Sequence, residues 1–306
     1  MILPAFVLPS RANQHWAESG IDSLGNCLNR RHFLNYAHNV DYQYNSRGFR
    51  DADWPNTITA LENAIWCVGD SFTVGLGSPV EHTWPYILQQ QTGRRCINLS
   101  MDGASNQWIA RKIQELAQEV VPKNVIIHWS YINRRELQYG TAFKKTIDLQ
   151  WSDFYNAIKD FSWPKCNSVT DIVNLPESIL KEIVEVHSDI AHTCPTLGYQ
   201  DYYQKISDED RRLWHGELAS SDINDTIKCI DQVTEQCFRI GTDLTQSFIP
   251  EFASSNVYSV VVDHLVAKGA KYVPAFDRID VARDGHHYDL ETAKFFVKNI
   301  IKNINC

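Results

Sequence analysis

A serine and a distant aspartate–histidine pair are the residues of this chain whose types and spacing could do chemistry. Ser71 follows the apolar run Ile65–Val68 and a Gly-Asp dipeptide, so we expect it on the turn after a buried strand. A serine hydroxyl is a poor nucleophile unless a base removes its proton. Near the other end of the chain, His287 stands three residues after Asp284. Together the three side chains have the types found in the catalytic triad of a serine hydrolase.

The chemistry expected of such a triad is ester cleavage. Ser71 would attack the ester carbonyl, and His287 would take the serine proton and later give it to the leaving alkoxide. Asp284 would hold the imidazole in the correct tautomer. His287 also lies just before a helix that Asp289 is expected to cap. The positive end of that helix is expected to disfavour the imidazolium and keep the base neutral near pH 7.

Each of these residues also has a plainer interpretation. A serine after Gly-Asp at a strand end can be a turn or helix-capping residue. Asp284, His286 and His287 could instead bind a metal ion, although the sequence shows no second histidine–carboxylate cluster. His286 otherwise fits the rim of a substrate site, and His128, inside an apolar run, fits the core.

Short apolar strands that alternate with helices make up the framework expected to position these residues. This pattern predicts a parallel sheet covered by helices on both faces. The expected strands are 65–68, 96–99, 125–129, 244–249 and 272–276, and the expected helices are 82–92, 105–120, 256–267 and 289–303. We therefore expect one α/β domain over residues 1–306.

Two segments depart from the alternation. Residues 1–60 are expected to be irregular. Between residues 137 and 240 the strand signal disappears, and helical patterns replace it at 151–161, 177–190, 207–219 and 222–238. We interpret this segment as a helical insertion that forms a lid or an interaction surface.

Composition limits the partners and the compartment. The 306 residues carry a formal charge of −8, which argues against nucleic acid or an anionic membrane surface as the main partner. No apolar stretch is long enough to span a bilayer, and the opening residues 1–9 lack the basic start of a secretory signal. Eight cysteines without CxxC pairs or regular spacing, two of them in expected strands, favour reduced thiols and a cytoplasmic protein, with a virus particle as an alternative location.

Four sequence blocks resemble the SGNH/GDSL hydrolase superfamily. The first, Val68-Gly69-Asp70-Ser71-Phe72-Thr73-Val74-Gly75-Leu76-Gly77, is very similar to the family's nucleophile block, and Tyr44-Asn45-Ser46-Arg47-Gly48-Phe49-Arg50 resembles a stretch that precedes it in many members. The second is Asn98-Leu99-Ser100-Met101-Asp102-Gly103-Ala104-Ser105. The third, Tyr131-Ile132-Asn133-Arg134, keeps the asparagine of the family's Gly-x-Asn-Asp but neither the glycine nor the aspartate. The last, Asp284-Gly285-His286-His287, fits the family's Asp-x-x-His, with Tyr288 where proline is common.

The resemblance implies a fold and an oxyanion hole. The fold would be a three-layer α/β/α sandwich with a five-stranded parallel sheet in flavodoxin-like order. The backbone N–H groups of Ser71 and Gly103 and the side-chain amide of Asn133 would bind the oxyanion. Asn133 could equally be a turn residue, and Gly103 could be present only for a positive φ angle.

The resemblance also implies a metal-independent esterase without a cofactor. It would cleave small acyl groups from a small-molecule or carbohydrate ester, with carbohydrate O-acetyl groups as the first class to test. Two alternatives stay open. The chain could keep the fold as a binding or assembly component that has lost turnover, or it could transfer the acyl group to an alcohol with the same triad. The sequence leaves the oligomeric state open.

Overall fold

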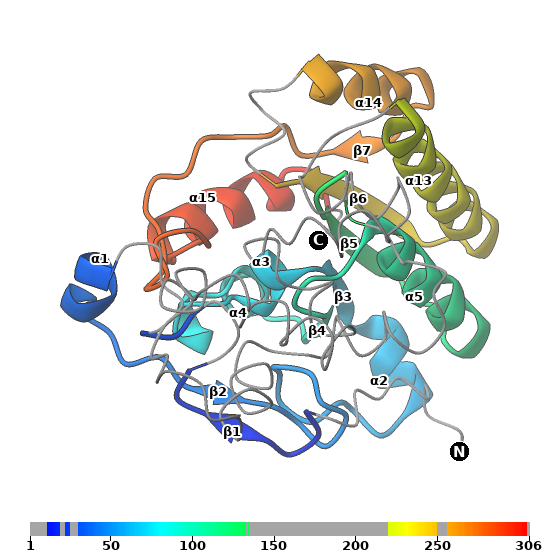
Figure 1. The fold of residues 1–306 in the computed structure, drawn as a ribbon. Helices are drawn as coiled ribbons and strands as arrows, with labels where there is room; N and C mark the ends of the chain where they lie inside the picture. The colour runs from blue at the N-terminus through cyan, green and yellow to red at the C-terminus, as the bar shows by residue number, and fades with distance from the viewer. Residues whose placement is uncertain are drawn as a thin grey trace, which may run out of the picture.

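The computed structural model describes residues 11–18, 22–24, 30–132, 134, 220–249 and 256–304. Five parallel strands form the central sheet, in the order β4-β3-β5-β6-β7 (Figure 1). They are β3 (Ile65–Gly69), β4 (Cys96–Ser100), β5 (Asn124–Trp129), β6 (Asp243–Phe248) and β7 (Lys271–Tyr272). Numbered along the chain, this order is 2-1-3-4-5, which is the flavodoxin-like arrangement of a doubly wound sheet. The predicted fold class is confirmed.

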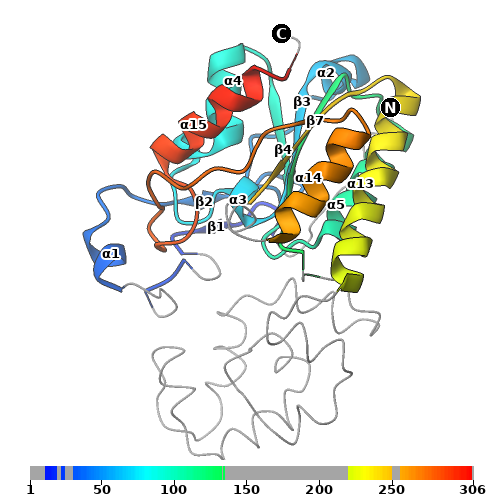
Figure 2. The same cartoon turned by 90° about the horizontal axis from the view of Figure 1, so that it is seen from above.

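Helices cover both faces of the sheet and make three layers. Figure 2 shows α4 (Trp84–Thr92) and α15 (Leu290–Ile301) on one face, and α5 (Asn106–Glu119), α13 (Ser220–Ile240) and α14 (Asn256–Ala267) on the other. Every residue of β3, β4 and β5 is buried, which explains why these strands are almost continuously apolar rather than alternating.

The last strand is shorter than the sequence pattern predicts. Residues 272–276 were expected to form it, but β7 contains only Lys271 and Tyr272. Val273 still donates its N–H to the carbonyl of Gln246 at 2.7 Å, and Pro274 follows. Proline has no N–H to give to a ladder, so the strand ends there.

The helix predicted at 222–238 is part of the layered framework. It forms α13, which packs against α5, and the Asn106 amide on α5 donates to the Thr226 hydroxyl at 3.2 Å. The helices expected at 151–161, 177–190 and 207–219 lie outside the described residues. A lid or interaction surface between 137 and 219 therefore stays a prediction.

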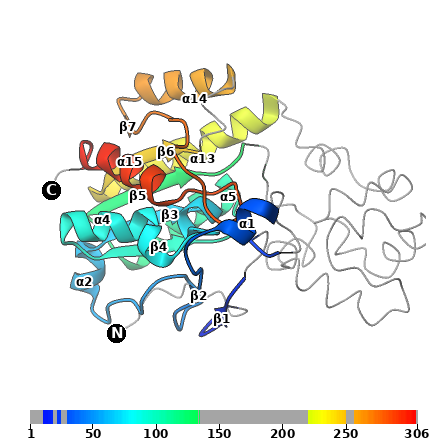
Figure 3. The same ribbon diagram turned by 90° about the vertical axis from the view of Figure 1, so that its left-hand side faces the viewer.

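The described part of the N-terminal segment, expected to be irregular, contains four short elements, of which an antiparallel pair of strands lies beyond the β4 edge of the sheet (Figures 1 and 3). They are β1 (His15–Trp16) and β2 (Tyr42–Gln43), which pair antiparallel, and the helices α1 (Arg30–Asn35) and α2 (Ile58–Asn63). Arg50 joins this segment to the chain after β3. Its guanidinium donates to the carbonyls of Ser78 at 2.7 Å and Asp41 at 2.9 Å, and also to that of Gly75.

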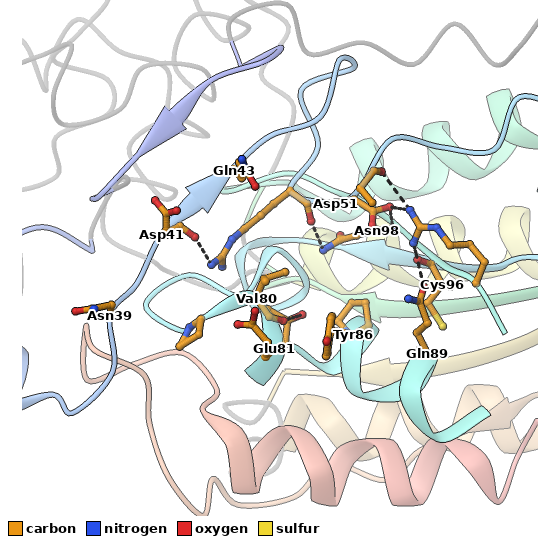
Figure 4. A pocket seen from close by; sticks show the side chains of 16 residues that line it. Asn39, Asp41, Gln43, Asp51, Val80, Glu81, Tyr86, Gln89, Cys96 and Asn98 are labelled. Carbon is orange, nitrogen blue, oxygen red and sulfur yellow. Dashed lines mark hydrogen bonds and ion pairs between the residues drawn. The ribbon is translucent and has the colours of Figure 1, made fainter. Parts of the chain in front are cut away.

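Side chains accept hydrogen bonds from the backbone along the outer edge of β4, where the described part of the sheet has no further strand. The N–H of Cys96 donates to the Gln89 side chain at 3.0 Å, and the N–H of Asn98 donates to the carboxylate of Asp51 at 3.1 Å. Arg95 in turn pairs with Asp51 at 2.8 Å. Figure 4 shows these groups beside a cleft of about 590 Å³ between α4 and the N-terminal segment, lined by both polar and apolar residues.

Two further observations bear on the expectations from composition. Cys67 and Cys96 are buried free thiols, as expected from their positions in strands. Among the described helices, none combines the length and the apolar character needed to cross a lipid bilayer.

Candidate active site

Ser71 lies on a tight turn between β3 and the four-residue helix α3 (Ser71–Val74). Asp70 is the helix N-cap, and its carboxylate accepts the N–H of Phe72 at 3.1 Å. At Gly69 a side chain would not fit, because a Cβ there would lie 2.2 Å from Thr73 Oγ1 and 2.9 Å from the carbonyl oxygen of His128. The Gly-Asp-Ser sequence thus folds into a turn that places the serine at the carboxyl end of the strand, where open α/β sheets bind ligands.

The Asp70 carboxylate is buried and held by two side chains from the loop after β5. Ser130 donates its hydroxyl at 2.7 Å, and Arg134 donates from Nη1 at 2.8 Å. Burial raises the pKa of Asp70 above its usual range, although the charge of Arg134 acts to lower it. The residue that precedes Ser71 is therefore a carboxylate that depends on its partners to stay ionised.

Asp284 and His287 form a hydrogen-bonded pair, as their spacing predicts. Asp284 Oδ2 lies 2.5 Å from His287 Nδ1, and its Oδ1 accepts the backbone N–H groups of His286 at 2.9 Å and His287 at 3.0 Å. Since the carboxylate accepts the Nδ1 proton, Nε2 is the nitrogen left to act as a base. Nε2 is buried and has no hydrogen-bond partner among the described residues.

Burial and charge shift the pKa values of Asp284 and His287 in opposite directions, and the effect of charge is the larger one. Burial by itself would lower the pKa of His287, but the Asp284 carboxylate raises it above the ordinary value, with smaller contributions from Asp102 and Asp70. Burial would raise the pKa of Asp284, but His287 and the two backbone N–H groups hold it at about 2. The net shift of the His287 pKa is therefore opposite to the one expected from the following helix alone, and the effect of the helix end itself stays a prediction.

The raised pKa of His287 predicts the acid side of the pH profile. The histidine must be neutral to accept a proton, so kcat/KM should rise as the pH passes upward through the pKa of His287. We expect the midpoint of this rise above 6.5, the ordinary value for histidine, in a pH series of ester hydrolysis. Burial lowers the pKa of His128 to about 3, so His128 does not account for the rise. A midpoint below pH 6.5 would contradict the assignment.

Direct hydrogen bonds join the segment after Ser71 to the loop that carries His287, here called the histidine loop. Ser78 donates its hydroxyl to the carbonyl of Tyr288 at 2.6 Å, and Arg283 donates its N–H to the carbonyl of Gly77 at 2.8 Å. Gly77 permits this approach, because it has a φ of 76° and a Cβ there would lie 2.8 Å from that of Ala282.

The structure brings the turn of Ser71 and the imidazole of His287 together. The ring of Phe72, the residue after Ser71, lies 4.6 Å from the His287 ring, centroid to centroid. Within the described part of the chain, no hydrogen bond joins the Ser71 hydroxyl to His287 Nε2. Catalytic hydrogen bonds are often long in unliganded enzymes and tighten when the substrate binds.

The predicted oxyanion donors are only partly described. Gly103 lies on the turn after β4 with a φ of 72°, and a Cβ there would meet no atom within 4 Å. Its backbone conformation therefore explains the glycine, and its role as a donor stays a prediction. Asn133 lies outside the described residues, so its role is also untested.

Asn106 is a site-building residue that the sequence analysis missed. This buried first residue of α5 accepts the N–H of Ser130 at 2.8 Å and donates to its carbonyl at 3.2 Å, so both backbone groups of Ser130 are fixed. A polar residue at the start of an otherwise amphipathic helix was the available signal. Asn98 acts similarly in the second block, where its amide donates to the carbonyl of Thr73 at 2.9 Å.

The remaining histidines near the site have partners. His128 is completely buried, lies 2.9 Å from the Ser247 hydroxyl and 3.1 Å from that of Tyr288, and is a core residue as predicted. His286 is half-buried, with Nε2 3.0 Å from the Tyr131 hydroxyl. In the described ranges, no three histidine, cysteine, aspartate or glutamate side chains converge in a way that could hold a metal ion.

Comparison with known proteins gives structural similarity at low sequence identity. No family model matches the chain, and no curated protein matches it. TesA is similar over 78% of this chain and 97% of its own, with a TM-score of 0.44 and 12% identity. The psychrotrophic esterase EstA from Pseudoalteromonas sp. is similar over 79% of this chain and 96% of its own, with a TM-score of 0.41 and 10% identity. A GDSL-like lipase from Bacteroides thetaiotaomicron VPI-5482 is similar over 81% of this chain and 90% of its own, with a TM-score of 0.40 and 8% identity.

Proposed function

We propose that this protein is a serine esterase that cleaves carboxylic esters of small acyl groups through an acyl-serine intermediate. One observation carries the proposal. The buried imidazole of His287 is oriented by Asp284 at 2.5 Å, keeps an Nε2 that has no hydrogen-bond partner among the described residues, and packs against the residue that follows Ser71. A core histidine would use both ring nitrogens, as His128 does.

The reaction would proceed in two halves. In the first, Ser71 Oγ bonds to the ester carbonyl carbon while its proton moves to His287 Nε2, and the imidazolium then protonates the departing alkoxide. In the second, a water molecule gives its proton to Nε2 and its oxygen to the acyl carbon, and the Ser71 oxygen leaves with that proton. The Ser71 and Gly103 backbone N–H groups, with the Asn133 amide, would bind the oxyanion in both halves.

Burial of the reacting groups supports a small acyl group. Ser71 is 3% exposed and His287 is 1% exposed, so a long chain would have to displace packed side chains. Carbohydrate O-acetyl esters are the first substrate class to test, on the strength of the sequence resemblance alone.

A covalent probe tests the proposed nucleophile. We expect a fluorophosphonate to form one adduct with the native protein, which mass spectrometry of the digest would locate on Ser71. Protein denatured before exposure is the control and should not react. If the native protein is not labelled and hydrolyses p-nitrophenyl acetate no faster than buffer, the esterase proposal fails and a binding or assembly role is favoured.

The same acyl-enzyme could pass its acyl group to an alcohol. Product analysis in the presence of sugar acceptors separates the two outcomes. Free acid as the product supports hydrolysis, and acylated sugar supports acyl transfer.

A further inference from the structure

The loop after β5 makes contacts with both halves of the candidate site. On one side, Arg134 Nη1 lies 2.8 Å from Asp70 Oδ2, next to Ser71. On the other, the hydroxyl of Tyr131 lies 3.0 Å from Nε2 of His286, next to His287. The two residues that make these contacts flank Asn133 in the sequence and are the two departures from the third family block.

Tyr131 and Arg134 also contact each other. The Arg134 guanidinium lies over the Tyr131 ring, 4.6 Å from its centroid. A cation over an aromatic face is attracted to it, and the planar ring limits the orientations that the guanidinium can adopt. The two side chains therefore form one continuous connection, which we call the loop clamp.

At one end of the clamp, Arg134 forms an ion pair with a buried carboxylate, that of Asp70. The Asp70 side chain is fully buried, whereas that of Arg134 is 31% exposed. Nη1 also donates to the Ser130 hydroxyl at 3.0 Å, so a single nitrogen contacts both the carboxylate and the hydroxyl that binds it. Without the guanidinium, a buried carboxylate beside the nucleophile would lose its ionic partner.

The other end of the clamp touches the residue beside the base. The His286 ring lies 5.3 Å from the Phe72 ring and 5.0 Å from the His287 ring. Arg278 donates to the His286 carbonyl on the same loop. A change in the position of His286 would therefore change the position of the His287 imidazole.

We propose that Tyr131 and Arg134 are positioning residues that fix the loop after β5 between the nucleophile turn and the histidine loop. Neither residue touches the reacting atoms. They act by holding Asp70 and His286 in place. The Ser71 hydroxyl and His287 Nε2 can then come within hydrogen-bond distance when an ester binds. This inference rests on the proposed esterase function, because it assigns the two residues to that reaction.

The test is a double-mutant cycle made of Arg134→Gln, Tyr131→Phe and their combination. Arg134→Gln should lower kcat about 10²-fold, the size of a small misplacement of reacting groups, with KM little changed. Tyr131→Phe keeps the ring under Arg134 and should lower kcat about tenfold, the cost of one hydrogen bond. Because the clamp is one connection, the double variant should be no slower than Arg134→Gln alone.

Rates are expressed per site that reacts with the fluorophosphonate, so that unfolded protein is not counted. Arg95→Gln is the matched control, because Arg95 pairs at 2.8 Å on the β4 edge with Asp51, whose side chain is only 11% exposed. It should keep the wild-type kcat per labelled site even if its melting temperature falls.

Three results would overturn the inference. Wild-type kcat per labelled site in both single variants would remove the positioning role. Losses that multiply in the double variant would show that the two residues act separately. A wild-type protein that is not labelled at Ser71 would overturn the esterase function and this inference with it, whereas labelled variants with full kcat would overturn the inference alone.

Discussion

Replacing Ser71 with alanine is expected to lower kcat for p-nitrophenyl acetate by about 10⁴- to 10⁶-fold, to the rate supported by the rest of the site. The hydroxyl supplies the bond-forming oxygen, and neither Thr73 nor Ser78 can replace it. A Cβ placed on Gly69 would lie 2.2 Å from the Thr73 hydroxyl, which is therefore turned toward the strand, and the Ser78 hydroxyl is bound to the carbonyl of Tyr288 at 2.6 Å.

Initial-rate kinetics and fluorophosphonate labelling check this prediction together. Ser46→Ala, which removes an exposed hydroxyl that donates to Asp53 at 2.8 Å, serves as the control and should retain full activity. Wild-type turnover in folded Ser71→Ala protein would exclude the acyl-serine mechanism.

Asp284→Asn is expected to lower kcat by about 10⁴-fold with little change in the fold. The Oδ1 position accepts two backbone N–H groups, so the amide oxygen should take that position. The NH₂ group would then face His287 Nδ1, which would have to accept a hydrogen bond. The ring proton would move to Nε2, and the imidazole could no longer act as the base toward Ser71.

The chain contains a matched control for this prediction. Asp231 on α13 lies 2.7 Å from Nε2 of His264 on α14, so Asp231→Asn alters an aspartate–histidine pair outside the candidate site. We expect this variant to keep the wild-type kcat. Equal kcat values for Asp284→Asn and the wild type would show that the histidine does not need this tautomer.

The strands of the framework were predictable because they are buried on both faces. Ile65–Gly69 has no exposed residue, so burial leaves an unbroken apolar run that a sequence pattern detects. The length of the strand that begins at Lys271 was overestimated, because apolar residues continue past Pro274, where the strand pairing ends. The antiparallel pair of β1 and β2 was missed, since each strand has only two residues.

The contact between Asp284 and His287 could be predicted from the sequence because it is local. Asp284 and His287 are three residues apart, so one turn of chain is enough to join them. The role of Arg134 was not recoverable, because its partner Asp70 lies 64 positions away and no local pattern links them. In the sequence, Arg134 is only a departure from a motif. In the fold, it is the ionic partner of Asp70, the residue that precedes Ser71.

The capped edge of β4 limits how this protein can associate with others. A free edge strand offers N–H groups to which a foreign strand can pair, as happens in β-augmentation and in aggregation. Here Gln89 and Asp51 already accept the outward N–H groups of Cys96 and Asn98. A neighbouring molecule could not add a strand at that margin without first breaking these bonds and the attachment of Arg95 to Asp51. Recruitment into a larger assembly would therefore have to use another surface of the molecule rather than extension of the sheet at β4.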